Sequence, residues 1–197
     1  MINVVRADQA EADVRQGIAE IFAEGFTQWL GFFSKDPKRI AAAFSHIFVL
    51  NQFYVALYKG QVVGMAACTD GTSLSVKLDK KELRKHLGLY KGTLAGIFLK
   101  KEFETNSVRP SPGVGSIEFV GTASKFRGQG VASQLIRKIF ELTPHKVYLI
   151  EEVADSNIPA MKLYYKLGFE EYKRRQIPVK RAKKIGINYV VSLRYIK

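Results

Sequence analysis

The sequence contains a single cysteine, Cys68, in 197 residues. One cysteine excludes an intramolecular disulfide framework and a zinc cluster built from cysteines. No apolar run reaches the roughly 18 residues that a membrane-spanning helix needs, so we expect no membrane partner. The residues after Met1 lack the basic and apolar regions of a secretory signal. Together these absences predict a protein of the reducing cytoplasm.

Acidic residues are also scarce. The chain has 18 Asp and Glu against 31 Lys and Arg, for a formal net charge of +13. Such an excess favours an anionic partner, which could be a nucleic acid, a membrane surface or a phosphorylated small molecule. No nucleic-acid-binding motif accompanies the charge, so a nucleic acid is not the expected partner. From Tyr172 to Lys197 there are nine basic residues and no acidic ones, which indicates a local surface feature centred on a connection over 173–184.

Histidines are few and scattered, at positions 46, 86 and 145. None has a neighbour at the His-x-Glu or His-x-x-x-His spacing of common metal sites, and we predict no metal. A Gly-Lys-[Ser/Thr] sequence is missing, which excludes a Walker A phosphate loop. Gly-x-Ser-x-Gly is missing too, so a serine hydrolase with a nucleophile elbow is unsupported. Cys68 ends an apolar strand and is better explained as a small buried residue than as a nucleophile.

Hydrophobic residues make up 47% of the chain, which is typical of a folded protein. Residues 1–197 read as one mixed α/β domain without an internal repeat or linker. Periodicity and turn signals predict strands over 2–6, 53–58, 61–67, 116–122, 147–153, 169–177 and 188–196. They predict helices over 10–30 (with Trp29 on the apolar stripe), 36–48, 77–87, 90–103, 128–142 and 157–167. Asp36 followed by Pro37 marks a helix start, and Arg109-Pro-Ser-Pro-Gly113 breaks regular structure.

A glycine-containing loop, Arg127-Gly128-Gln129-Gly130, stands between a predicted strand and a predicted helix. The free amides at a helix N-terminus attract anions, and glycine lets the backbone come close to a ligand. The helix places Val131, Leu135, Ile139 and Leu142 on one stripe, which we expect to pack on the sheet. The loop lacks the third glycine of the dinucleotide-binding fingerprint, since Ser133 takes that place. A plain glycine-rich turn remains the alternative.

Two spaced motifs resolve part of this ambiguity. Arg127-Gly128-Gln129-Gly130-Val131-Ala132 matches the pattern [Gln/Arg]-x-x-Gly-x-[Gly/Ala]. A second signature follows one helix and one strand later, as Asn157, Ala160, Leu163-Tyr164 and Gly168-Phe169. Over about 115–175 the chain therefore resembles the Gcn5-related N-acetyltransferase (GNAT) family. The resemblance implies a mixed, mostly antiparallel sheet with a central splayed pair of parallel strands and helices on both faces.

The same resemblance implies the activity. In this family acetyl-coenzyme A is the cosubstrate, and its acetyl group passes directly to an acceptor amine. We therefore expect an acetyl-coenzyme A-dependent N-acetyltransferase that acts on a primary amine of a small molecule or peptide. A non-catalytic acyl-coenzyme A-binding or regulatory module with the same fold is the alternative.

The family's binding mode suggests residues for the cosubstrate. The pantetheine arm would enter between strands 116–122 and 147–153, held by the backbone of Val120 and Thr122. Gly121 between them would allow a bulge or a close backbone approach. Asn157 matches the family's cofactor-contacting asparagine, although it would also serve as a helix N-cap. The pyrophosphate would bind the amides of Arg127, Gly128, Gln129, Gly130, Val131 and Ala132.

Two residues are candidates for proton transfer. Tyr164 matches the position of the family's general acid, with a packed aromatic as the alternative. Glu118 is the candidate general base because it shares strand parity with Val120 and Thr122. Glu151 and Glu152 on the partner strand are alternatives, and any of these glutamates could instead be solvated or ion-paired.

A long connection separates two strands that are consecutive in the family. Residues 69–113 lie where a short turn is usual, and connections of that length hold extra structure or a function. We interpret 69–113 as a helical insertion beside the acceptor site or at a subunit contact. The sequence does not decide whether the chain forms a homodimer.

Overall fold

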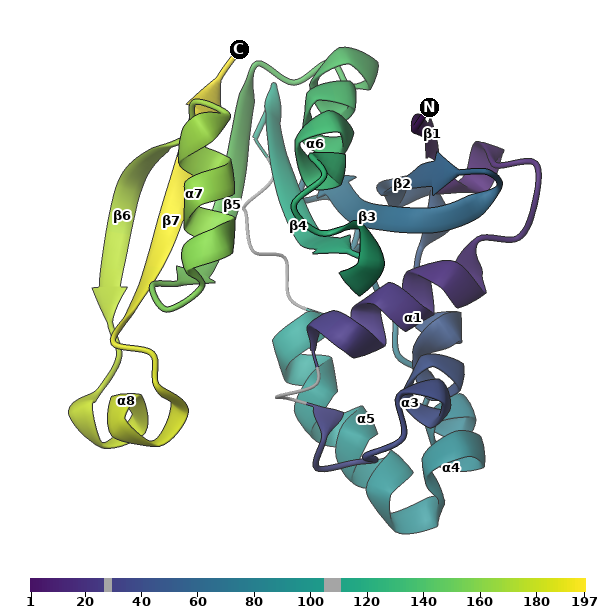
Figure 1. The fold of residues 1–197 in the computed structure, drawn as a ribbon. Coiled ribbons are helices and arrows are strands. Elements are labelled where there is room, and N and C mark those ends of the chain that lie inside the picture. The colour runs from purple at the N-terminus through teal and green to yellow at the C-terminus, as the bar shows by residue number, and fades with distance from the viewer. Residues whose placement is uncertain (27–29, 105–110) are drawn as a thin grey trace.

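Figure 1 shows the fold in a computed structural model, which describes residues 1–26, 30–104 and 111–197. The strands are β1 (Asn3–Arg6), β2 (Phe53–Tyr58), β3 (Gln61–Thr69), β4 (Val114–Thr122), β5 (Val147–Ala154), β6 (Glu170–Gln176) and β7 (Tyr189–Ile196). The α-helices are α1 (Arg15–Gly25), α3 (Pro37–Phe44), α4 (Lys80–Leu87), α5 (Leu89–Phe103), α6 (Val131–Leu142), α7 (Ile158–Lys166) and α8 (Val179–Ile185).

One sheet contains all the named strands, in the order β1-β2-β3-β4-β5-β7-β6. The β4–β5 pair is parallel, and every other neighbouring pair is antiparallel. This arrangement confirms the fold expected from the sequence. Along the described parts of the chain, no helix has the length and apolar character needed to cross a membrane.

The core lies in two clusters, one on each face of the sheet. Helices α6 and α7 cover one face, where residues such as Leu135 and Ile139 pack against the strands (Figure 1). We call this the α6 face. Helix α1 covers the opposite face, the α1 face, and α3, α4 and α5 extend that layer away from the sheet. Leu142, expected on the packing stripe of α6, is 49% exposed because it is the last residue of the helix; Ile136 and Phe140 are buried there instead.

The N-terminal helices follow their local signals. At the start of α3 the Asp36 side chain accepts a hydrogen bond from the Lys38 amide at 2.9 Å, and Pro37 occupies the first helical position. Helix α1 is shorter than the expected 10–30, and Trp29 lies outside the described residues. The first two residues of the expected break, at 109 and 110, also lie outside them.

Helices α4 and α5 occupy the long connection between β3 and β4 (Figure 1). The side chain of Asp79 caps α4 by accepting from the Lys81 amide at 2.6 Å. Gly88 separates the two helices with a φ of +81°, a conformation that glycine adopts readily. Leu83 and Leu87 of α4 are buried in the cluster on the α1 face.

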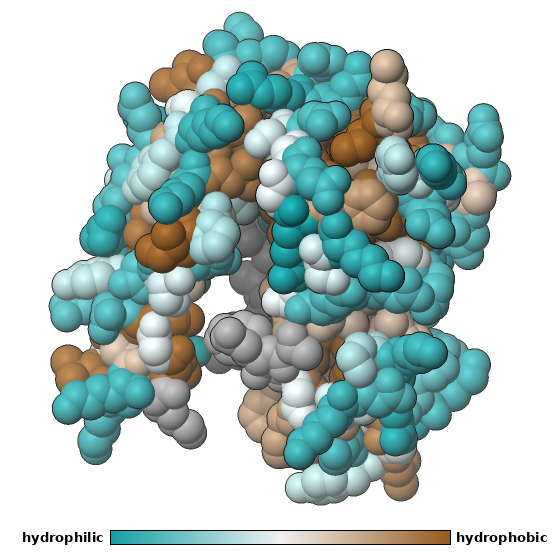
Figure 2. Space-filling view, in the orientation of Figure 1, coloured by the Kyte–Doolittle hydropathy of each residue, from teal (hydrophilic) through white to brown (hydrophobic). Residues whose placement is uncertain are grey.

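The basic C-terminal segment is more structured than the connection we expected over 173–184. Its first part belongs to β6, and residues 179–185 form α8 at the tip of the β6–β7 hairpin. Local signals for this helix were present in the sequence, because Pro178 precedes it and Gly186 ends it with a φ of +69°. In the space-filling view, the molecule is hollowed between the α8 end of the hairpin and the helical layer (Figure 2).

Candidate functional site

The parallel strands β4 and β5 separate at one end. Their pairing runs only from Val114↔Val147 to Ser116↔Leu149. Beyond this point each strand contains a β-bulge against its other neighbour, at Phe119–Val120 in β4 and at Glu151–Glu152 in β5. Phe119 and Glu152 have positive φ values of 52° and 55°, which side-chain-bearing residues seldom adopt. Bulges bend a strand, so the paired distortions open a splay between β4 and β5.

The β4 bulge overturns one step of our sequence argument. Glu118 does not share a face with Val120 and Thr122, because the extra residue of the bulge reverses the alternation between them. Glu118 lies opposite Ala67, which belongs to the cluster on the α1 face. Val120 packs against the cluster on the α6 face. Thus Glu118 lies on the opposite face of the sheet from Val120 and Thr122, with which strand parity had grouped it.

Backbone groups near the end of β4 remain available to the splay. The Ala123 amide donates to the Val63 carbonyl at 3.0 Å, so the groups of Ala123 point toward β3. Since backbone groups alternate along a strand, those of Thr122 point toward β5. The Thr122 carbonyl accepts from the Arg127 Nε at 3.2 Å. Gly121 permits a close approach to α1, because an added Cβ would lie 2.7 Å from Ile21 Cγ2.

The loop between β4 and α6 presents a helix N-terminus. Gly128 and Gly130 have φ values of +75° and +78°, so both need the left-handed region that glycine favours. No side chain caps the first turn of α6, in contrast to the starts of α3, α4 and α7. Arg127 and Gln129 are exposed beside it. The first turn of α6, which no side chain caps, is therefore suited to an anion.

The second motif lies on α7. Asn157 is its N-cap and accepts from the Ala160 amide at 3.3 Å, which is the capping role we considered for it. Tyr164 is only 6% exposed, and its ring meets Phe169 edge-on at 5.9 Å between centroids. Burial raises the pKa of Tyr164 above the ordinary value for a phenol, so its hydroxyl stays protonated at neutral pH. The neighbouring Tyr165 is 47% exposed.

Glu118 is a half-buried carboxylate on the α1 face. Its Oε2 accepts from the Ser75 hydroxyl at 2.6 Å, and its Oε1 accepts from the Ser116 hydroxyl at 3.0 Å. Burial raises the pKa of Glu118, and the two hydroxyl groups oppose that rise because they stabilise the charged form. Sequence reasoning missed Ser75, which is 43 residues away in the chain and carries no local signal.

The alternative glutamates have different partners. Glu151 accepts from the hydroxyl of Ser192 at 2.6 Å and from that of Tyr172. Glu152 is exposed and forms an ion pair with Arg175 at 2.7 Å. Cys68 is buried, and burial is the main cause that raises the pKa of its thiol to about 12, which disfavours a thiolate. Within the described part of the chain, no group of three or more His, Cys, Asp or Glu side chains gathers as a metal site.

Comparisons with solved structures identify the same fold. The chain is similar to an N-acetyltransferase from Staphylococcus aureus Mu50, with 20% identity, a TM-score of 0.60, and 99% and 100% of the two chains covered. It is similar to the protein PH1933 from Pyrococcus horikoshii OT3, with 17% identity, a TM-score of 0.59, and 100% and 99% covered. A GCN5-related N-acetyltransferase from Kribbella flavida gives 18% identity, a TM-score of 0.57, and 100% and 98% covered.

A comparison with curated protein sequences finds no match. A family model, described as the acetyltransferase (GNAT) family, matches residues 16–169. The match includes both motifs, the splayed strands and helices α3 to α7. The cosubstrate of this family is acetyl-coenzyme A. From the family model and the shared fold, the chain belongs to the acetyltransferase (GNAT) family.

Proposed function

We propose that this protein is an acetyl-coenzyme A-dependent N-acetyltransferase that acts on a primary amine of a small molecule or peptide. We also propose that residues 1–197 work as one domain in the cytoplasm, with 69–113 as a helical insertion. The observation that carries the proposed activity is the placement of Glu118 and Tyr164 on opposite faces of the splayed β4–β5 pair.

The α6 face would bind the cosubstrate. The amides from Gly128 to Ala132 suit its pyrophosphate, because no side chain caps the first turn of α6. Arg127 adds a guanidinium, while its own amide donates to the Ser124 carbonyl at 3.3 Å and would have to turn to the phosphate. The outward backbone groups of Thr122, together with those of Val120, suit the amides of the pantetheine arm. The Arg127 side chain would then exchange its bond to the Thr122 carbonyl for a phosphate. Asn157 keeps its amide nitrogen for a further contact while its oxygen caps α7.

The α1 face would receive the acceptor. A primary amine arrives mostly protonated and cannot attack until it loses a proton. Glu118 would take that proton, since burial holds the pKa of its carboxyl above the usual range. Acetyl-coenzyme A supplies the acetyl group as a thioester. On the other face Tyr164 would donate a proton to the departing sulfur, because a phenol hydroxyl is protonated at neutral pH.

A non-catalytic acyl-coenzyme A-binding module would share the fold and the loop. Thiol release distinguishes the two functions. The protein is incubated with acetyl-coenzyme A and a panel of primary amines, amino acids and peptides, and free coenzyme A is followed over time. We expect amine-dependent release with at least one member of the panel.

Two controls establish that the released thiol comes from transfer of the acetyl group to an amine. Omitting the amine measures hydrolysis, and mass spectrometry of the acceptor establishes transfer to nitrogen. Tight binding of acetyl-coenzyme A without turnover on any amine would contradict the enzyme and favour the module. Gel filtration of the same sample tests whether the chain forms a homodimer.

A further inference from the structure

We propose that Ser75 is a positioning residue for the general base, which it holds charged and aimed at the splay through its hydroxyl group. This inference rests on the proposed function, because it assigns Ser75 a role through Glu118. Ser75 belongs to the connection between β3 and α4, outside both family motifs. It would make the long connection part of the catalytic arrangement.

The contact between the two side chains is short and enclosed. Ser75 is 3% exposed, and its hydroxyl donates to Glu118 Oε2 at 2.6 Å. Ser116 donates to the other carboxylate oxygen at 3.0 Å. An ionised carboxylate only accepts hydrogen bonds, so one donor on each oxygen fixes its plane and still leaves lone pairs for a proton. Glu118 follows the last paired residue of β4, Ser116, by two positions, which puts it where the splay opens.

Ser75 is itself held by backbone bonds on both sides. Its carbonyl accepts from the Val49 amide at 2.9 Å, and the Lys77 amide donates to the Ile47 carbonyl at 2.8 Å. Between these bonds Val76 forms a β-bridge with Phe48. The segment from Ser75 to Lys77 is therefore fixed to the chain that follows α3, and its hydroxyl position follows from that attachment.

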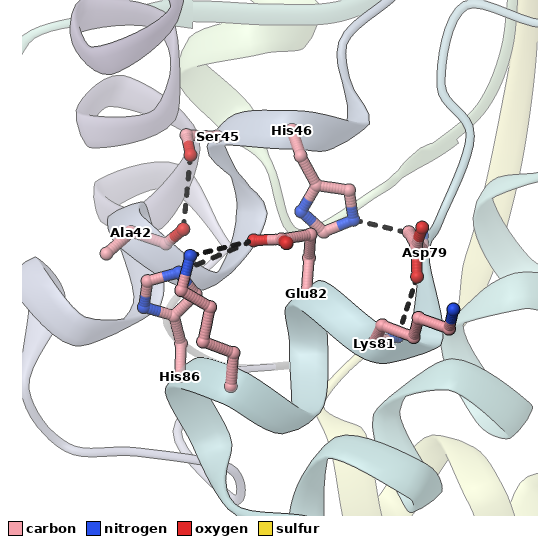
Figure 3. A network of polar contacts seen from close by, with 8 residues as sticks. Ala42, Ser45, His46, Asp79, Lys81, Glu82 and His86 are labelled. Atoms are coloured by element: carbon pink, nitrogen blue, oxygen red, sulfur yellow. Dashed lines mark hydrogen bonds and ion pairs between the residues drawn. The ribbon is translucent and has the colours of Figure 1, made fainter.

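The next residues anchor the segment to the start of α4. The Leu78 amide donates to a carboxylate oxygen of Glu104, just after α5. The Asp79 amide donates to His46 Nε2 at 2.9 Å, as Figure 3 shows beside the contact of His86 with Glu82. Burial lowers the pKa of His46, which favours the neutral ring that can accept this bond. A displacement of α4 or α5 would therefore reach Ser75 through these contacts.

The charged form of the Glu118 carboxylate depends on its hydroxyl partners. Burial disfavours the charged carboxylate, and the Ser75 and Ser116 hydroxyls are the groups that stabilise it among the described residues. Within the part of the chain that the structure describes, Cys68 on β3 is a titratable group that interacts electrostatically with Glu118. Its thiol remains neutral because its pKa is raised to about 12, mainly by burial. Removing the Ser75 hydroxyl should therefore raise the pKa of Glu118. A hydrogen bond to a charged group is strong enough to move a pKa by about one unit.

The test measures kcat/KM for the amine against pH in the full-length protein. In the pH–rate profile, the acidic limb is the part where kcat/KM rises with pH as the base loses its proton. With Ser75→Ala, we expect this limb to move up by about one pH unit, because the base must be deprotonated to act. Below the limb, the rate should fall about tenfold, while KM for acetyl-coenzyme A is unchanged. Ser75→Thr keeps the hydroxyl and should restore the wild-type limb. If Ser75→Ala does not fold, Ser75→Cys offers a weaker donor of similar size and should shift the limb in the same direction.

Ser192→Ala is the matched control. Ser192 is also 3% exposed and also donates to a glutamate at 2.6 Å, but that glutamate is Glu151. We expect similar loss of thermal stability in both alanine variants and a shifted limb only for Ser75→Ala. An unmoved limb in Ser75→Ala, or an equal shift in Ser192→Ala, would overturn the inference.

The variant Glu118→Gln distinguishes a failure of the proposed base from a failure of the role of Ser75. Glu118→Gln should abolish the acidic limb and most of the activity if Glu118 is the base. Full activity of Glu118→Gln would refute the base and the role of Ser75 together. Loss of activity in Glu118→Gln with an unmoved limb in Ser75→Ala would refute only the role of Ser75.

Discussion

Replacing Tyr164 by phenylalanine separates a catalytic hydroxyl from a packed ring. Tyr164 is 6% exposed and belongs to the hydrophobic cluster on the α6 face. Burial is the one cause found for the raised pKa of Tyr164, and no hydrogen bond to its hydroxyl is found among the described residues, so Tyr164→Phe leaves no partner unpaired. The phenyl ring keeps the contact with Phe169, so we expect the free energy of unfolding to change by less than about 0.5 kcal/mol.

The effect on turnover should be much larger. A positioned general acid contributes roughly a hundredfold to ten-thousandfold to the rate. At about 1.4 kcal/mol per factor of ten, the barrier should rise by roughly 3–5 kcal/mol. Affinity for acetyl-coenzyme A should stay near the wild-type value, since the hydroxyl acts on the departing sulfur. The thiol-release assay gives kcat, calorimetric titration gives the affinity, and urea unfolding gives the stability.

Tyr148→Phe is the control for this comparison. Tyr148 is fully buried on β5, and its hydroxyl lies 2.7 Å from Thr143 Oγ1. Loss of that hydrogen bond should cost about 1 kcal/mol of stability and leave turnover intact. Turnover of Tyr164→Phe within about threefold of the wild type would refute Tyr164 as the general acid. A loss of stability in Tyr164→Phe as large as that in Tyr148→Phe would show that the Tyr164 hydroxyl has a structural partner, and would contradict the expected separation.

Three further predictions concern the loop, the strand and the helical layer. Arg127→Ala should weaken acetyl-coenzyme A binding by about 1–3 kcal/mol in calorimetry if the guanidinium meets a phosphate; a smaller loss would leave the loop amides as the main anion site. Gly121→Ala places a Cβ 2.7 Å from Ile21 Cγ2 and should lower the free energy of unfolding by about 1–3 kcal/mol in urea, whereas Gly128→Ala, with open space around it, should show only backbone strain. The folded-state pKa of His46 lies below its ordinary value of 6.5, so its contribution to stability is present above pH 6.5 and is lost as the pH falls toward the folded value. Unfolding titrations between about pH 7.5 and 5.5 should show this loss in the wild type and less of it in His46→Gln; equal losses would assign the effect to another group.

Local patterns in the sequence were sufficient for most elements and for the loop. The start of α3 was predictable because Asp36 and Pro37 act on their own helix. The cosubstrate loop was predictable because glycines at 128 and 130 suit positive φ and the next residues form an amphipathic helix. Helix α8 was missed, although Pro178 and Gly186 mark its ends, because its positively charged residues resemble a solvated connection.

The position of Glu118 required the tertiary structure. Alternation along a strand puts residues two apart on one face, and on that rule Glu118 belonged with Val120. The bulge at Phe119–Val120 breaks the rule, because it adds one residue against Ala66 of β3. In this bulge Phe119 turns toward the rings of Phe22, Phe26, Phe53 and Phe103, which come from distant parts of the chain.

The sequence by itself determined that this chain belongs with acetyltransferases, through two motifs whose residues lie close together along the chain. The tertiary structure decided which face each candidate group occupies and which side chains hold it. Ser75 donates a hydrogen bond to Glu118 although the two residues are 43 positions apart in the sequence, and no local spacing encodes that contact. The physical reason is that face and partner depend on strand register and on packing between distant segments, whereas loops and helix caps depend on neighbouring residues.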